Sequence, residues 1–101
     1  MRIKAIQLNE VQLSLSILAD VDFEHFSDFA QPLVKQLDCH IIERQWGADR
    51  HQWLLDFEGC QLQLHYEFYG DICWLSVSKE EDIEVLTYLA GCLKPYVMSE
   101  N

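Results

Sequence analysis

Three polar side chains near the middle of the chain have the types that a hydrolase uses. A histidine imidazole titrates near neutral pH and can take a proton from a serine hydroxyl. His65 and Ser76 lie on segments that the sequence predicts to be neighbouring strands, with Gln52 beside them on a third strand. A serine nucleophile also needs an orienting carboxylate and an oxyanion site, and the sequence indicates neither. We therefore interpret these residues as a polar row on a sheet surface and expect no catalytic residues.

The cysteines and histidines offer a second candidate chemistry, metal binding or a thiol nucleophile. Cys39, Cys60, Cys73 and Cys92 have spacings that match no zinc pattern such as Cys-x2-Cys. Cys39 and His40 are adjacent, so on a strand their side chains point to opposite faces. Free, mainly buried thiols in a reducing compartment explain the cysteines without a function. We expect no metal site and no cofactor.

The charge balance excludes several classes of partner. The net charge is −10, and only seven Lys and Arg residues are present. Phosphate backbones and anionic membranes demand basic side chains, so we expect no direct binding to nucleic acid or membrane. No apolar run reaches the roughly 18 residues that a membrane span needs. The segment from Met1 to Lys4 lacks a signal-peptide core, which indicates a cytoplasmic protein.

The strongest structural pattern lies directly around His65. Apolar and polar residues alternate from Cys60 to Tyr69, as in a half-buried strand. Gly70-Asp71 follows, and a Gly in the first place suits a two-residue type II′ turn. The resulting register pairs Tyr69 with Ile72, Phe68 with Cys73, Tyr66 with Leu75 and Leu64 with Val77.

A second turn is expected upstream, at Glu58-Gly59. A two-residue loop there pairs Phe57 with Cys60, Leu55 with Leu62 and Trp53 with Leu64, all on the apolar face. A three-residue loop with a Gly bulge would instead pair Asp56 with Cys60 and turn Trp53 outward. The burial pattern favours the two-residue loop.

The first residues of the chain also predict strands. Val11 to Ile17 alternates apolar and polar residues, as a strand with one wet face does. The segment from Ile3 to Leu8 is either a separate strand that turns at Asn9-Glu10 or the first half of one long, bulged strand. The pattern leaves both open, and we take the hairpin as the working prediction.

Two further segments predict helices. Residues 20–37 carry apolar side chains at helical spacing, with Asp22 as the expected N-cap. Pro32 lies inside this run, and because the stripe stays in phase across it, we expect one bent helix. Ser78 to Glu81 has the sequence of a capping box, so a second helix should run from there to about Lys94.

These elements together predict the fold class. Cys39 to Trp46 is a further strand beside the one that starts near His51, and Glu43 and Arg44 indicate a sheet edge. Two helices with one apolar stripe each and a sheet with one apolar face must bury these surfaces against each other. We predict a single α+β domain over residues 1–101, a two-layer sandwich in which an antiparallel meander sheet carries two helices on one face, in the order β(β)αββββα.

The opposite face of this sheet is the surface most suggestive of function. The predicted register places Gln52, His65 and Ser76 in one row and Arg50, Glu67 and Trp74 in the next. Exposed aromatic and apolar side chains often mark an interface. The equal alternative is that a loop or the N-terminal segment of the same chain covers them. The interface candidates are Leu54, His65, Glu67, Tyr69, Ile72 and Trp74.

The leading functional hypothesis is a small protein–protein interaction module whose partner is a second copy of the chain. The first alternative is an acidic inhibitor or nucleic-acid mimic that binds a basic protein, because acidic residues cluster at residues 20–28 and 80–84. Capping and helix-dipole effects explain the same clusters without a function. The second alternative is a small enzyme that uses His65 or a cysteine.

Two stretches carry a resemblance to a known group of proteins. The segments LQLHYEFYGDICWLSVS and EEDIEVLTYLAGCL, at residues 62–78 and 80–93, are similar to those of a small family of uncharacterised, single-domain gammaproteobacterial proteins. The resemblance covers nearly the whole chain and rests on general pattern. It implies a cytosolic bacterial protein of unknown function and supplies no functional residues.

Overall fold

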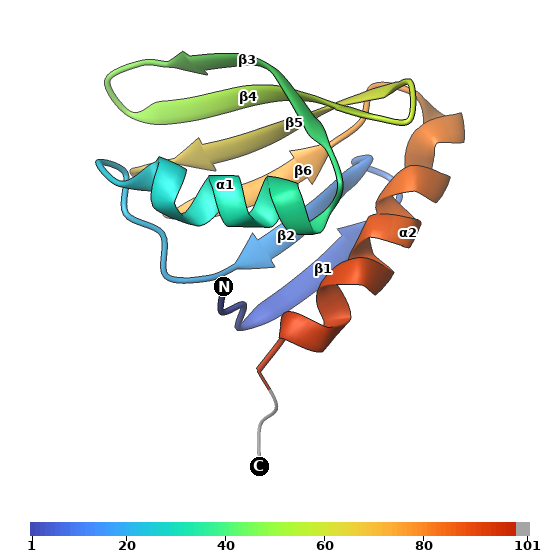
Figure 1. The fold of residues 1–101 in the computed structure, drawn as a ribbon, viewed down its shortest axis with the longest axis horizontal. Coiled ribbons are helices and arrows are strands. Elements are labelled where there is room, and N and C mark those ends of the chain that lie inside the picture. Colours follow the sequence, from blue (N-terminus) through green and yellow to red (C-terminus); the bar gives the residue numbers. More distant parts are fainter. Residues whose placement is uncertain (99–101) are drawn as a thin grey trace.

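The computed structural model describes residues 1–98 and shows one six-stranded antiparallel sheet with two helices on one face (Figure 1). The sheet order is β1-β2-β6-β5-β4-β3. The strands are β1 (Ala5–Asn9), β2 (Ser14–Leu18), β3 (His40–Trp46), β4 (Arg50–Phe57), β5 (Cys60–Glu67) and β6 (Ile72–Ser76). The helices are α1 (Phe26–Gln36) and α2 (Ile83–Leu93), with short 3₁₀ turns at Glu80–Asp82 and Lys94–Tyr96. The predicted α+β class, the element order and the meander β3 to β6 are confirmed.

The N-terminal segment forms the separate hairpin that was one of the two predicted versions. Ala5 to Asn9 pairs with Ser14 to Leu18, and the Asn9 side chain accepts a hydrogen bond from the Gln12 backbone N–H at 3.0 Å. The prediction that a strand begins at Val11 is wrong, because Val11 lies in this turn and is 93% exposed. The backbone reverses with Leu13 at φ 53°, so regular pairing starts only at Ser14.

The turn between β4 and β5 is the predicted two-residue loop. Glu58 and Gly59 both have positive φ, 49° and 87°, as a type I′ turn requires. The register therefore pairs Phe57 with Cys60, Leu55 with Leu62 and Trp53 with Leu64, as predicted. Trp53 is buried, so the bulged alternative does not occur.

The predicted register between β5 and β6 is wrong by two residues. Tyr66 pairs with Cys73 and Glu67 with Ile72, so the loop has four residues, Phe68 to Asp71. Asp71 takes the positive φ of 48°, and its N–H donates to the Phe68 carbonyl at 3.1 Å. A shift of two residues leaves every side chain on its predicted sheet face, since the side-chain period is two. Tyr69 no longer lies opposite Ile72 and sits in the loop.

Helix α1 starts later than predicted, at Phe26 instead of residue 20. The prediction of Asp22 as the N-cap is wrong, because His25 holds that position. The Asp22 carboxylate accepts a hydrogen bond from the Glu24 N–H at 3.1 Å and lies 2.7 Å from His25 Nδ1, so it closes a local turn before the helix. One continuous helix runs through Pro32, as predicted. The apolar stripe of α1 faces the core, with Phe26, Ala30, Leu33, Val34 and Leu37 buried.

Helix α2 lacks the predicted capping box. Lys79 precedes the Glu80–Asp82 3₁₀ turn, and no side chain caps it. The α-helix begins at Ile83 and ends at Leu93, close to the predicted end at Lys94, and Pro95 lies in the 3₁₀ turn that follows it. The side chains of α2 that are buried against the sheet are Leu86, Leu89 and Leu93.

Candidate functional site

The sheet face opposite the helices, the outer face, is built from the polar positions of all six strands. Because both helices pack on the inner face, no helix of residues 1–98 covers it (Figure 1). One row of paired residues crosses the whole sheet and consists of Gln7, Ser16, Trp74, His65, Gln52 and Gln45. The next row consists of Asn9, Ser14, Ser76, Gln63, Leu54 and Glu43. Glu43 is the one acidic or basic side chain in these two rows apart from the imidazole of His65.

The centre of the outer face is a stack of His65 on Trp74. The ring centroids are 4.6 Å apart and the planes meet at 11°. His65 Nε2 also lies 2.8 Å from the Ser76 hydroxyl oxygen. Burial lowers the pKa of His65, and the nearby Glu67 opposes this effect. The imidazole is therefore neutral at pH 7 and is held by one stacking contact and one hydrogen bond.

The other predicted interface residues divide between the sheet and a loop. Leu54 is half-buried on the outer face between two shallow hollows of about 170 and 140 Å³. Glu67 lies between Arg50 on one neighbouring strand and Ile72 on the other. Tyr69 instead projects from the β5–β6 loop and is largely exposed.

The shifted register also corrects the two predicted rows. His65 lies between Gln52 and Trp74, whereas Ser76 pairs with Gln63. Ser76 still reaches His65 because the two residues are diagonal neighbours with their side chains on one face. The Arg50 row ends in Ile72 instead of Trp74.

The His65–Ser76 pair is not arranged as a nucleophile and base. Ser76 is the last residue of a flat strand, and the hollow that it lines has a volume of about 140 Å³. Substrate pockets are usually about 300–1,000 Å³. The structure gives His65 no hydrogen-bonded carboxylate among the described residues. The geometry therefore fits a surface hydrogen bond better than a hydrolytic site.

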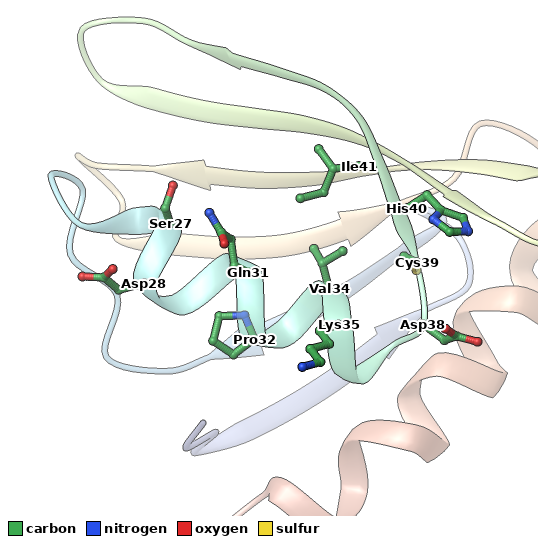
Figure 2. A pocket seen from close by; sticks show the side chains of 10 residues that line it. All are labelled: Ser27, Asp28, Gln31, Pro32, Val34, Lys35, Asp38, Cys39, His40 and Ile41. Atoms are coloured by element: carbon green, nitrogen blue, oxygen red, sulfur yellow. The ribbon is translucent and has the colours of Figure 1, made fainter.

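A larger hollow lies between α1 and the start of β3 and has a volume of about 840 Å³. Figure 2 shows Ser27, Gln31 and Val34 on the upper side of the helix, with Val34 below Ile41 of β3. It is an open groove without a convergent set of catalytic groups. Cys39 lines it, but burial and the nearby Asp38 carboxylate raise the pKa of this thiol to about 12, so the sulfur stays protonated.

All four cysteines are free thiols. Burial also raises the pKa of Cys73 to about 12, and of Cys60 to a smaller extent. Within residues 1–98, no three His, Cys, Asp or Glu side chains gather closely enough to hold a metal ion. The thiols therefore act as small, mainly apolar side chains, Cys73 within the core and the other three at its edge.

The two acidic clusters lie at opposite ends of the molecule. Figure 1 shows the segment before α1 at the left and the start of α2 at the upper right. In the first cluster Asp20 pairs with Lys4 at 2.8 Å, and Asp22 pairs with His25 at 2.7 Å. The structure therefore provides two separate negative areas instead of one continuous patch that resembles a phosphate backbone.

The comparison with protein families gives a match that spans both helices and every strand. The family described as "Protein of unknown function (DUF3630)" matches residues 3–94, which is nearly the whole chain. The chain belongs to this family. The expected membership of an uncharacterised family is thereby confirmed, and the DUF3630 family brings no assigned site residues. Comparisons with curated proteins and with solved structures found no significant match. Among the described residues, no helix is long and apolar enough to cross a membrane.

Part of the outer face of this DUF3630 member was not predicted from the sequence. Gln7, Ser16 and the exposed Leu18 belong to it only because β2 lies next to β6. Local alternation indicates that these side chains share one strand face but does not indicate which strand is the neighbour. No local signal in the sequence would have supplied this pairing.

Proposed function

We propose that the protein is an interaction module that self-associates through the outer face of its sheet. The observation that carries this proposal is the uncharged row that crosses the outer face through the His65–Trp74 stack. The chain has a net charge of −10, yet the row through these two residues crosses six strands without an ionised side chain at neutral pH. An acidic chain that binds a second copy of itself needs such a face, because charge repulsion opposes contact elsewhere.

The side chains on this face suit a self-complementary interface. A twofold dimer brings the same patch together from both copies. Gln and Ser side chains both donate and accept hydrogen bonds, so they can pair with their own type. Trp74, Leu54 and Ile72 supply apolar area, and a half-buried Trp is the kind of residue that dominates binding energy.

Sedimentation velocity of Trp74→Glu tests the proposal. We expect the wild type to sediment as a dimer and Trp74→Glu as a monomer, because the substitution places a charge at the centre of the interface. Tyr88→Glu is the matched control, since Tyr88 is an exposed aromatic residue on α2, on the other side of the sheet. It should remain dimeric.

A second substitution guards against a folding defect in the first. Ile72 lies at the margin of the outer face and is exposed, so Ile72→Glu should fold normally and weaken the dimer. Circular dichroism checks that every variant is folded. A wild type that is monomeric at its highest soluble concentration, or a dimer that persists in both variants, would refute self-association through this face.

The proposal includes a cytosolic location in a gammaproteobacterial cell. Four free thiols support a reducing compartment, because oxidising compartments favour disulfides. Fractionation of cells that express the tagged full chain tests the location. Recovery in a periplasmic or membrane fraction would contradict it.

A further inference from the structure

A second surface lies at the end of the sheet where three loops meet. We define the aromatic end patch as Phe23, Trp46, Phe68 and Tyr69. Trp46 is 72% exposed, Phe68 53% and Tyr69 85%. Phe23 comes from the segment before α1, Trp46 from the end of β3, and Phe68 and Tyr69 from the β5–β6 loop. These three segments lie at the same end of the molecule in Figure 1. Large exposed aromatic side chains gathered in one place are typical of a binding surface.

The loops that carry this patch are tied to one another. The Phe68 N–H donates to the Asp49 carbonyl at 2.8 Å, which joins the β5–β6 loop to the β3–β4 turn. His51 Nε2 lies 2.8 Å from the Phe23 carbonyl oxygen, and the two rings are 4.6 Å apart. Trp46 is the cross-strand partner of His51 on the same face. The patch is therefore pre-organised, which lowers the entropic cost of binding.

The aromatic rings meet at steep angles. Phe23 and Phe68 are 5.9 Å apart at 68°, and Phe68 and Tyr69 are 5.5 Å apart at 69°. Each edge-to-face contact covers at most one face of a ring, and Tyr69 keeps most of its surface in solvent at 85% exposure. A ring face carries the negative part of the quadrupole and attracts an ammonium or guanidinium group.

Carboxylates outnumber cationic groups around the patch. The same loops contribute the carboxylates of Asp22, Glu24, Asp49 and Asp71. Arg50, the first residue of β4, lies 3.5 Å from Asp49. The Tyr66 hydroxyl donates to Asp71 at 2.9 Å and sits between the segment before α1 and the β5–β6 loop. Aromatic faces within an acidic surround select a cation.

We propose that the aromatic end patch binds a cationic, partly apolar segment of another protein, in which Arg or Lys alternates with aliphatic residues. Charge complementarity carries the choice of partner: the acidic loops attract basic side chains, and the exposed rings offer both cation–π contacts and apolar area. The same charges repel nucleic acid and anionic lipid. This surface does not depend on self-association, since its residues lie at the end of β3 and in loops beyond the strand ends, outside the two rows that cross the outer face.

Calorimetry with defined peptides tests the proposal. The probe is a short synthetic peptide of alternating Arg and Leu, and its matched partner has Glu in place of Arg. We expect the full chain to bind the Arg peptide and not the Glu peptide, with amide shifts in NMR spectra confined to the three loops. Tyr69→Ser and Phe68→Ser should each weaken binding by about fivefold or more, as loss of a cation–π contact at a partly desolvated site predicts.

Two control variants make the outcome decisive. Tyr88→Ser removes an exposed aromatic residue of α2 and should bind like the wild type. Trp74→Glu should also bind the Arg peptide normally, even where it dissociates the dimer. This result would show that peptide binding does not use the outer face. Equal affinity for the Arg and Glu peptides, shifts located elsewhere, or full binding by both loop variants would overturn the proposal.

Discussion

His65 shows how a single residue on an open sheet comes to be uncharged. Its ring is covered on one face by Trp74 at 4.6 Å, and its Nε2 is engaged with the Ser76 hydroxyl at 2.8 Å. The ring is partly buried by these contacts, and burial costs the imidazolium hydration that the neutral imidazole does not need. Burial therefore lowers the pKa of His65 below its ordinary 6.5.

This shift predicts how the stability of the protein depends on pH. Below about pH 6.5 the unfolded chain binds a proton at this position before the folded chain does, so the free energy of unfolding falls as the pH decreases toward the folded pKa. Above pH 6.5 the residue is neutral in both states and contributes nothing to the pH dependence. We expect His65→Gln to lose less stability than the wild type on acidification. Urea unfolding at a series of pH values measures the difference, and parallel curves would contradict the prediction.

His25 provides an internal control, because its pKa is shifted in the opposite direction to that of His65. The Asp22 carboxylate, hydrogen-bonded to His25 at 2.7 Å, raises the pKa of this exposed imidazole. The stabilising contribution of His25 is therefore present below about pH 6.5 and is lost as the pH rises through the folded pKa. His25→Gln should lose more stability than the wild type on acidification, so the two histidine variants should diverge from it in opposite directions.

The turn between β4 and β5 shows how an element can be defined by two backbone angles. Glu58 adopts φ 49°, a conformation that is unfavourable for most side chains, and Gly59 adopts φ 87°. The hairpin tolerates Glu58 because a two-residue loop keeps the apolar residues of both strands on the inner face, whereas a three-residue loop would turn them outward. An Asn-Gly pair would satisfy the same geometry with less strain.

We therefore predict that Glu58→Asn stabilises the fold by roughly 0.5–1 kcal/mol, and that Gly59→Ala destabilises it by about 1–2 kcal/mol. No atom lies within 4 Å of a Cβ added at Gly59, so the second effect is purely conformational. Thermal unfolding measures both, since 1 kcal/mol corresponds to about 4–8 °C in a domain of this size. A rise in stability for Gly59→Ala would mean that the turn is not type I′.

The two hairpins also show how far sequence reasoning reaches. At Glu58-Gly59 the alternatives differed by one residue, which exchanges the sheet faces, so the apolar pattern selected the correct loop. At Gly70-Asp71 a two-residue loop and a four-residue loop place the same side chains on the same faces, so the pattern could not separate them. The positive φ at Asp71 decides the loop type, and sequence alone suggested Gly70 for that role.

Prediction of the candidate site from the sequence succeeded and failed for the same reasons. The side chains of Leu54, Glu67, His65, Ile72 and Trp74 lie on the outer face as predicted, because strand parity alone determines this. Tyr69 does not, because it follows the last paired residue of β5. The neighbours β2 and β6 are joined only through long-range packing, which no local pattern encodes. The aromatic end patch depends on the same long-range packing of three loops.

At the scale of the whole molecule, the acidic charge is mostly uncompensated. The chain has 17 Asp and Glu residues against seven Lys and Arg, and the described residues form three ion pairs, one of them through a histidine. Repulsion between the remaining carboxylates acts over about 10 Å at 0.1 M salt and is screened at higher salt. The two proposed surfaces should therefore respond to salt in opposite ways.

Self-association through the uncharged row of the outer face should strengthen as NaCl is added. Salt screens the repulsion between two copies that each have a net charge of −10. Binding of the Arg–Leu peptide at the aromatic end patch should weaken over the same series, because salt screens an attraction between opposite charges. Sedimentation and calorimetry on one set of buffers measure both. A dimer that dissociates in high salt would show that ion pairs hold it together and that the uncharged row is not its main contact. Peptide binding that is independent of salt would show that the acidic loops do not select the partner.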